Sequence, residues 1–201
     1  MRIALTALSL ALAATPVVAQ MPAPGSMSTA SITAGTYAVD SGHTQVAWTL
    51  NHLGFSLYHG LFGNPTGSLT LDPAKPNAST LTISFPIANV ATTSDKLNQH
   101  LMSADFFDAA KFPTATFTST KVTASGTSAT VVGNLTLKGV TKPVTLAVKF
   151  TGAGANPMSK AVTVGFSATG TVKRSDFGIS YGVPAVGDQV DLVLTGAFEK
   201  K

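Results

Sequence analysis

The feature that most constrains this chain is a two-residue alternation of apolar and polar side chains. Val46, Trp48 and Leu50 are separated by small or polar neighbours, and His52 continues the series. The same pattern recurs in four further segments, with apolar residues at Leu81, Ile83, Phe85 and Ile87, at Val144, Leu146, Val148 and Phe150, at Val162, Val164 and Phe166, and at Val190, Leu192 and Leu194. A period of two is typical of β-strands that bury one face. The sequence therefore predicts an all-β fold.

Further strands are expected between short turn signals. They cover residues 57–62, 67–71, 114–122 and 128–137. Regular short strands separated by turns are typical of an antiparallel sandwich or an up-and-down barrel. A closed barrel of about eight strands leaves no exposed edges. We expect one such domain over residues 35–201.

One segment departs from the alternation and predicts a short helical insertion. Ser94 precedes residues 95–102, and its hydroxyl can accept hydrogen bonds from the first free amides of a helix there. Residues 104–111, which include Phe106 and Phe107, are expected to form a second helical turn.

The N-terminus has the order of a secretory signal peptide. Arg2 gives a positive start, residues 3–14 are almost wholly apolar, and small residues precede a cut after Ala19. This run is shorter than the about 20 residues of a membrane-spanning helix, so we do not expect the chain to span a membrane. The sequence predicts a signal peptide over 1–19 and a flexible lead-in over residues 20–34, which are rich in Met, Pro, Ser and Thr.

The mature chain has few of the groups used in catalysis or nucleic-acid binding. It contains no cysteine, one arginine (Arg174) and one glutamate (Glu199), and its lysines are scattered. A nucleophile elbow, a phosphate-binding loop and a dinucleotide fingerprint are missing from the sequence. Scattered lysines do not form a basic patch. We therefore expect neither an enzyme nor a nucleic-acid-binding protein.

The interior of a barrel of about eight strands is either filled by side chains or holds one small ligand. Phe85, Phe117, Phe150, Phe166 and Trp48 all belong to apolar faces. These rings are bulky enough to fill the space. The alternation by itself favours a packed core.

Four groups of segments, in a fixed order, carry a resemblance to a known family. They are Tyr37 to Thr44 running into Val46 to Gly54, then Gly60-Leu61-Phe62, then Asp105 to Asp108 with Phe112-Pro113, and finally Gly133 to Val144 with Arg174 to Ile179. Through these segments the chain resembles the YceI-like family of bacterial periplasmic proteins, also called the polyisoprenoid-binding family, over residues 35–198.

This resemblance implies an extended, eight-stranded, lipocalin-like antiparallel barrel with a long cavity. Family members hold isoprenoid chains, fatty-acid-like amides or quinone-like lipids, and several are dimers. The expected function is thus periplasmic binding or transport of a long apolar lipid, with no obligatory cofactor but with a bound polyisoprenoid or similar lipid. Transient membrane contact and a homodimer are further expectations.

The apolar faces and the family segments together give the predicted ligand-binding residues. Wall residues are expected at Trp48, Leu50, Phe85, Phe117 and Phe166. The helical insertion is expected to contribute a cover or gate with Phe106, Phe107 and Phe112. The remaining predicted positions are His52, Arg174 and Phe177.

Two of these positions have an alternative, purely structural interpretation. His52 is either a contact for a lipid head group or a neutral histidine bonded to the backbone. The Arg174 fork suits a phosphate or carboxylate head group. Its alternative is an ion pair with Asp176, Asp188 or Asp191.

Two other functions stay open. A small periplasmic hydrolase or metal-dependent enzyme would use His43 or His52. The position of His43 in a turn favours instead a role in fixing its own loop, and the histidine spacing is a weak metal signal. A stress-response module that acts through protein contact would combine a filled barrel with an apolar surface patch.

Overall fold

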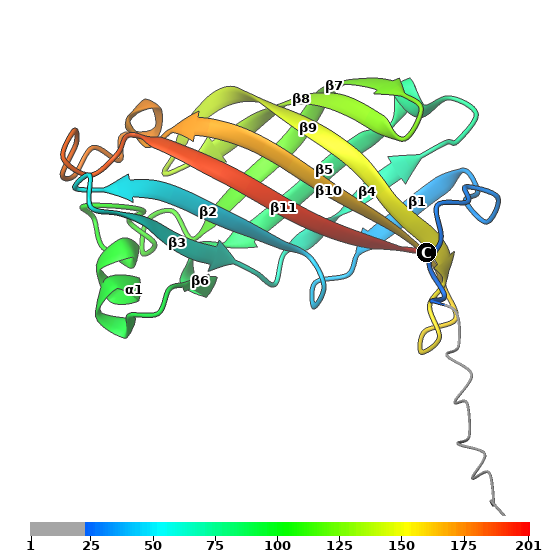
Figure 1. Cartoon of the computed structure of the whole chain (residues 1–201), viewed down its shortest axis with the longest axis horizontal. Helices are drawn as coiled ribbons and strands as arrows, with labels where there is room; N and C mark the ends of the chain where they lie inside the picture. The colour runs from blue at the N-terminus through cyan, green and yellow to red at the C-terminus, as the bar shows by residue number, and fades with distance from the viewer. Residues whose placement is uncertain (1–22) are drawn as a thin grey trace, which may run out of the picture.

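The computed structural model describes residues 23–201. The predicted signal peptide lies outside the described residues. Strands dominate the described chain, as the alternation predicts, and they form an elongated antiparallel barrel (Figure 1).

Eight strands close this barrel, which confirms the expected fold class. Their order around the sheet is β1-β4-β5-β7-β8-β9-β10-β11, and β11 pairs back with β1. The bounds are β1 (Gly35–Val39), β4 (Thr66–Leu71), β5 (Thr80–Pro86), β7 (Thr114–Ser125), β8 (Ser128–Leu137), β9 (Val140–Ala155), β10 (Val162–Lys173) and β11 (Gln189–Lys200).

The remaining strands form an extension beside β11. In this extension β2 (Gln45–His52) pairs with Asp191 to Thr195 of β11. The end of β11, from Phe198 to Lys200, pairs instead with β1. Next to β2 lie β3 (Ser56–Phe62) and the short β6 (Val90–Ala91). Three 3-10 turns complete the elements: η1 (Pro76–Ala78), η2 (Ile87–Asn89) and η3 (Arg174–Phe177).

The predicted helix is present as α1 (Asp95–Met102) and lies below β3 and beside β6 at one end of the barrel (Figure 1). Ser94 caps it as expected, because its hydroxyl accepts a hydrogen bond from the Leu97 amide at 3.3 Å. The second helical turn predicted for residues 104–111 is wrong. That stretch forms irregular turns, and Asp108 has a φ of 51°, which a right-handed helix does not allow.

Three clusters of buried apolar side chains divide the interior. The middle cluster contains Ile83, Phe85, Phe117, Val131, Val144, Leu146 and Phe177. A second cluster around Tyr37 and Val164 lies at the end of the barrel that carries the C-terminus (Figure 1). A third, around Trp48 and Leu101, joins the barrel to α1.

The segment before β1 makes specific contacts with the barrel. Ser26 and Ala153 exchange backbone hydrogen bonds of 3.0 and 2.8 Å, and Ile32 is only 9% exposed. The hydroxyl of Tyr37 donates to the Thr33 carbonyl at 2.7 Å. Residues 26–33 therefore contact the barrel, and the flexibility expected for the lead-in over residues 20–34 stays a prediction. Composition could not show this, because the segment is held by partners distant in the sequence.

Substituting Tyr37 with Phe tests this attachment. The ring remains buried, but the bonds between its hydroxyl and Thr33 are lost, so the free energy of unfolding falls by about 1 kcal/mol. Amide hydrogen exchange of residues 26–33 quickens at the same time. The control is Tyr181→Phe, because Tyr181 is 54% exposed. Equal exchange in wild type and Tyr37→Phe would show that the hydroxyl does not hold the segment.

Candidate ligand cavity

The barrel interior encloses a cavity of about 560 Å³, within the range of small-molecule sites. This corrects the packed core that the alternation favoured. Alternation states which side chains turn inward, whereas the enclosed space depends on their sizes and on the barrel diameter. In the middle of the barrel the wall is aliphatic, with Val131, Val144, Leu146, Ala168 and Leu194.

The two ends of the cavity differ in character. At one end its lining residues are also exposed: Thr29, Pro73, Pro76, Gly126, Thr127 and Ser128. These belong to the lead-in, the β4–β5 loop and the β7–β8 turn, on the right of Figure 1, and they form a mouth rich in hydroxyl groups. At the other end the lining comes from Leu101, Phe106 and Phe107, in and after α1. The cavity thus runs from a polar mouth to an apolar cap.

All five predicted wall residues line the cavity: Trp48, Leu50, Phe85, Phe117 and Phe166. Two of the rings lie over glycines on the neighbouring strand. A Cβ on Gly133 would come within 2.3 Å of Phe117, and one on Gly60 within 2.1 Å of Trp48. These glycines therefore leave the space in which the rings pack.

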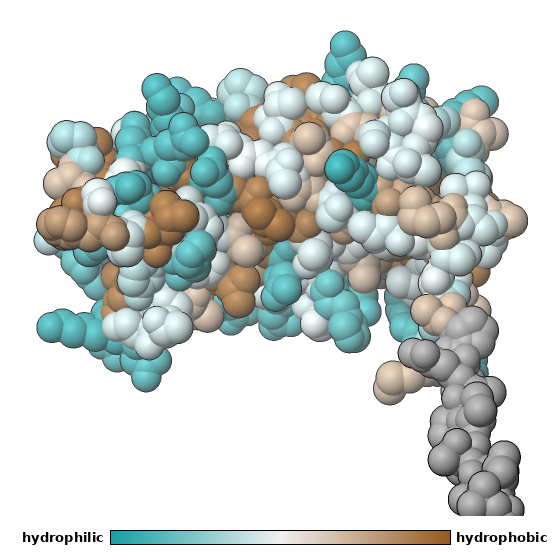
Figure 2. All heavy atoms as spheres, viewed as in Figure 1, coloured by the Kyte–Doolittle hydropathy of each residue, from teal (hydrophilic) through white to brown (hydrophobic). Residues whose placement is uncertain are grey.

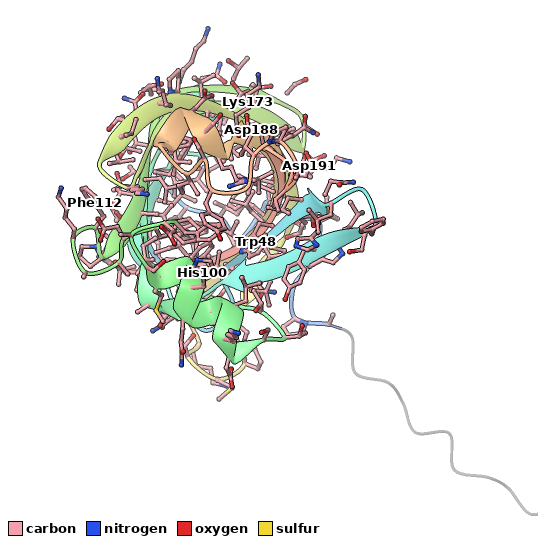
Figure 3. The ribbon with its side chains drawn as sticks, turned by 90° about the vertical axis from the view of Figure 1, so that its left-hand side faces the viewer. Trp48, His100, Phe112, Lys173, Asp188 and Asp191 are labelled. Atoms are coloured by element: carbon pink, nitrogen blue, oxygen red, sulfur yellow. The ribbon has the colours of Figure 1, made fainter. Side chains whose placement is uncertain are left out.

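Among the three rings of the predicted gate, Phe106 and Phe107 line the cavity. Phe107 packs edge-on against Phe62, with 5.4 Å between the ring centroids. Phe112 does not line the cavity and lies at the periphery in the end-on view (Figure 3). Its ring covers Gly139, and the Lys111 ammonium lies 5.2 Å from its centroid. The expectation for Phe112 is therefore wrong.

His52 and Phe177 also lie away from the cavity lining. His52 ends β2, beyond the cavity, and its ring is 6.1 Å from that of Tyr58. Phe177 is only 1% exposed and packs in the middle cluster. The alternation placed His52 on the face of Trp48, but it did not show where along β2 the cavity ends.

Arg174 borders the cavity but is held by backbone carbonyls. Its Nε donates to Gly187 at 2.8 Å, and its Nη2 donates to Val186 at 2.8 Å. Its Nη1 donates to Ile179 at 3.2 Å and to Tyr181 at 2.8 Å. Four of the five N–H groups of an arginine are thereby used.

No ion pair replaces the head-group contact predicted for Arg174. Among residues 23–201, a basic side chain lies within 4.0 Å of a carboxylate only at His43–Asp40 and His100–Asp105. Burial lowers the pKa of Arg174, partly offset by the charge of Asp188. Arg174 therefore holds the β10–β11 loop in place. The ion pair expected as its alternative role is wrong, whereas a contact between Arg174 and a ligand head group stays a prediction, because Arg174 borders the cavity.

Asp188 fixes the other side of that loop. Its carboxylate accepts from the Ser175 hydroxyl at 2.7 Å and from the Ser175 amide at 2.9 Å. Both hydrogen bonds lower the pKa of Asp188, and the bond from the hydroxyl has the larger effect. Together with Arg174 they connect η3 to the start of β11.

Several cavity residues were missed by the sequence prediction. The alternation contains the signal for Ile83, Val144 and Leu146, which occupy inward positions of predicted strands. No local signal marks Ile32 or Ser79, which reach the cavity from a lead-in and a loop. The hydroxyl of Ser79 and Nε1 of Trp48 are buried without a protein hydrogen-bond partner.

The sequence profile of the YceI-like domain matches residues 37–198. The chain belongs to the YceI-like family. The chain is 38% identical over 164 residues to a "UPF0312 protein" of Pseudomonas aeruginosa strain LESB58, covering 81% of this chain and 85% of that one. It is also 38% identical over 169 residues to "Protein YceI" of Salmonella arizonae, with 83% and 88% covered.

Solved structures share this YceI-like fold. Burkholderia cenocepacia BcnA is 26% identical with a TM-score of 0.70, covering 79% of this chain and 98% of that one. The Campylobacter jejuni YCEI protein is 30% identical with a TM-score of 0.66, covering 75% and 90%. A polyisoprenoid binding domain from Saccharophagus degradans, implicated in plant cell wall breakdown, is 14% identical with a TM-score of 0.57, covering 82% and 98%. This last likeness concerns the fold alone.

The histidine-based alternative gains no support from the geometry. No group of three His, Cys, Asp or Glu residues suited to a metal ion occurs within residues 23–201. His52 is the last of the eight residues of β2 and His43 precedes the first, so the two histidines lie at opposite ends of a strand about 23 Å long at ~3.3 Å per residue. His43 instead bonds Asp40 at 2.7 Å, as expected for a residue that fixes its loop.

Within the described part of this YceI-like chain, no helix combines the length and apolar character required to cross a membrane.

Substituting Gly60 with Ala tests the packing of Trp48. The new methyl group displaces the indole, so the emission of Trp48, the single tryptophan, shifts in wavelength. Overpacking also lowers the free energy of unfolding by about 1–3 kcal/mol. Gly63→Ala is the control, because nothing lies within 4 Å of its Cβ position. Identical spectra for both variants would contradict the packing of the indole over β3.

Arg174→Lys tests the role of the guanidinium. An ammonium offers three donors from one point and cannot reach carbonyls spread along the β10–β11 loop. We expect the free energy of unfolding to fall by about 3 kcal/mol, measured by denaturant titration. The exposed neighbour Lys173 gives the control Lys173→Ala, which changes it little. A fully stable Arg174→Lys variant would show that the four carbonyl bonds are dispensable.

Proposed function

We propose that this YceI-like protein binds one long apolar lipid in its barrel cavity and carries it through the periplasm after export. The observation that carries the proposal is the cavity of about 560 Å³, which extends from the hydroxyl-lined mouth to the apolar cap. A compact polar substrate would find few polar partners along this apolar wall.

The energetics of burial support a chain-like ligand. Each CH₂ group moved from water into an apolar site contributes about 0.8 kcal/mol. A tail that passes Val131, Leu146 and Ala168 replaces water contacts along its whole length. Enclosing even part of a lipid tail therefore gives firm binding without any charged contact.

The distribution of polar groups supports one orientation. The mouth carries the hydroxyl groups of Thr29, Thr80, Thr127 and Ser128, which can surround a head group. The tail then points toward Leu101 and Phe106. The unpartnered Ser79 hydroxyl and Trp48 N–H are polar atoms that a ligand oxygen could satisfy.

The ligand class that we propose to test first is a polyisoprenoid. The Saccharophagus degradans domain of the same fold is described as a polyisoprenoid binding domain, and its 14% identity leaves the ligand of the present chain to experiment. Quinone-like lipids and fatty-acid amides suit the same apolar wall. The proposal assigns no catalytic residue and no obligatory cofactor.

Lipid analysis of the natively exported protein tests the proposal. The protein is purified from the periplasm of its own host, and native mass spectrometry and solvent extraction identify any bound lipid. We expect about one lipid molecule per chain. Protein that carries no lipid and also fails to bind polyprenol, quinone and fatty-acid amide in titrations would refute the proposal.

Filling the cavity provides the matched variant. Ala168 lines the cavity, whereas Val193 on the adjacent strand is 54% exposed. We expect Ala168→Trp to reduce copurified lipid roughly 10-fold, because the indole occupies the space of the tail. Val193→Trp adds the same group outside the barrel and leaves lipid content unchanged. Equal lipid content in both variants, with both folded by circular dichroism, would place the lipid elsewhere.

A further inference from the structure

The tip of the β2–β3 hairpin exposes large apolar side chains. Phe55 is 89% exposed, Leu57 is 61% exposed and Leu53 is 47% exposed. Apolar residues gather at this end of the molecule in the space-filling view (Figure 2), and the hairpin extends beyond the ring of strands in the end-on view (Figure 3). An exposed group of this kind marks a site of interaction.

The backbone holds this tip in a defined shape. Phe55 donates its amide to the His52 carbonyl at 3.1 Å, and Gly54 donates to the Asn51 side chain at 2.7 Å. Leu53 has a φ of 58°, a conformation that large side chains adopt rarely. This backbone conformation costs free energy, and the exposed Leu53 side chain does not offset that cost by packing. Strained residues of this kind cluster at functional sites.

A second loop joins the same surface. Leu53 donates to the Ala185 carbonyl at 3.0 Å, and Gly187 donates to the Asn51 carbonyl at 2.8 Å. The β10–β11 loop thereby lies against the hairpin. Its Tyr181, which is 54% exposed and packs against His100 and Phe106, continues the exposed surface toward the cavity cap. We call Leu53, Phe55, Leu57 and Tyr181 the apolar tip.

The chain around the apolar tip carries no Asp, Glu, Lys or Arg. This holds from residue 41 to residue 71 and again from residue 177 to residue 187. Entry into a medium of low dielectric constant would therefore desolvate no Asp, Glu, Lys or Arg side chain from either segment. Tyrosine, with an apolar ring and a polar hydroxyl, is a side chain that favours the membrane–water boundary.

The size and shape of the apolar tip decide between partners. Its side chains expose roughly 500 Å² if such a side chain exposes about 200 Å² in full. A stable protein interface buries about 800 Å² on each partner. The tip is also a protruding point, whereas insertion of a few apolar side chains into the boundary of a bilayer needs no complementary surface.

We propose that the apolar tip inserts into a lipid bilayer surface and docks the protein on it. Tyr181 lies 5.3 Å from Phe106 between ring centroids, and Phe106 lines the apolar cap of the cavity. Docking therefore brings the capped end of the cavity to the bilayer. The inference goes beyond lipid carriage, because docking needs no ligand in the barrel.

Flotation with vesicles tests the docking. The exported chain is mixed with vesicles of phosphatidylcholine alone or of phosphatidylcholine with phosphatidylglycerol, at low and at high salt. Because the tip is uncharged, we expect similar binding under all four conditions. Binding that requires phosphatidylglycerol and disappears in high salt would overturn the proposal in favour of an electrostatic contact elsewhere.

The matched variants are Phe55→Ser and Met158→Ser. Met158 is 91% exposed and lies in the β9–β10 loop at the other end of the barrel. We expect Phe55→Ser to weaken vesicle binding roughly 10-fold and Met158→Ser to leave it unchanged. Equal binding of the Phe55→Ser variant and wild type, or equal losses in both variants, would refute the assignment. Thermal melting checks that both variants fold.

Two further measurements separate the remaining outcomes. Phe55→Trp places an indole at the tip, and its emission shifts to shorter wavelength when vesicles are added if the tip inserts. Sedimentation analysis tests a second copy of the chain as the partner. A dimer that Phe55→Ser dissociates, with no flotation of wild type, would overturn membrane docking. Neither readout depends on copurified lipid, so failure of the carrier function and failure of docking are distinguishable.

Discussion

Closure of the sheet between β1 and β11 is the contact on which the rest of the structure depends. It consists of three residue pairs, at Tyr37–Lys200, Ala38–Glu199 and Val39–Phe198. Without it the strands would form an open sheet with an unpaired edge, and their inward faces would have to collapse on one another. Because β1 pairs only with the end of β11, the middle of β11 can pair with β2. One short pairing therefore both encloses the cavity and positions the extension that caps it.

The cavity persists because its wall is made of side chains too small to meet across the barrel. Aliphatic residues such as Val131 and Ala168 line the middle, and the large rings lie along the wall over Gly60 and Gly133 rather than across the lumen. Polar links occur mainly where loops must be held, as in the bonds from Arg174 to four carbonyls. The barrel thus separates an apolar lumen from a rigid, hydrogen-bonded rim.

The β10–β11 loop connects the two proposals. The β10–β11 loop is fixed by Arg174 on its inner side and contacts the hairpin tip on its outer side. Phe106 and Tyr181 then join the cavity cap to the exposed surface. A carrier of membrane lipid needs an apolar interior and a means of reaching a bilayer, and the fold places these two features at adjoining positions.

The sequence by itself determined the strands, the helix cap at Ser94 and the inward positions of Trp48, Phe85 and Phe117, because period and capping act between near neighbours in the chain. Family likeness added the closed barrel. Only the tertiary structure decided that the barrel is hollow, that Ile32 is buried at its end, and that Arg174 binds carbonyls rather than a carboxylate. It also decided that His52, Phe112 and Phe177 lie away from the cavity. These outcomes depend on enclosed volume and on contacts between distant segments, which no local pattern encodes.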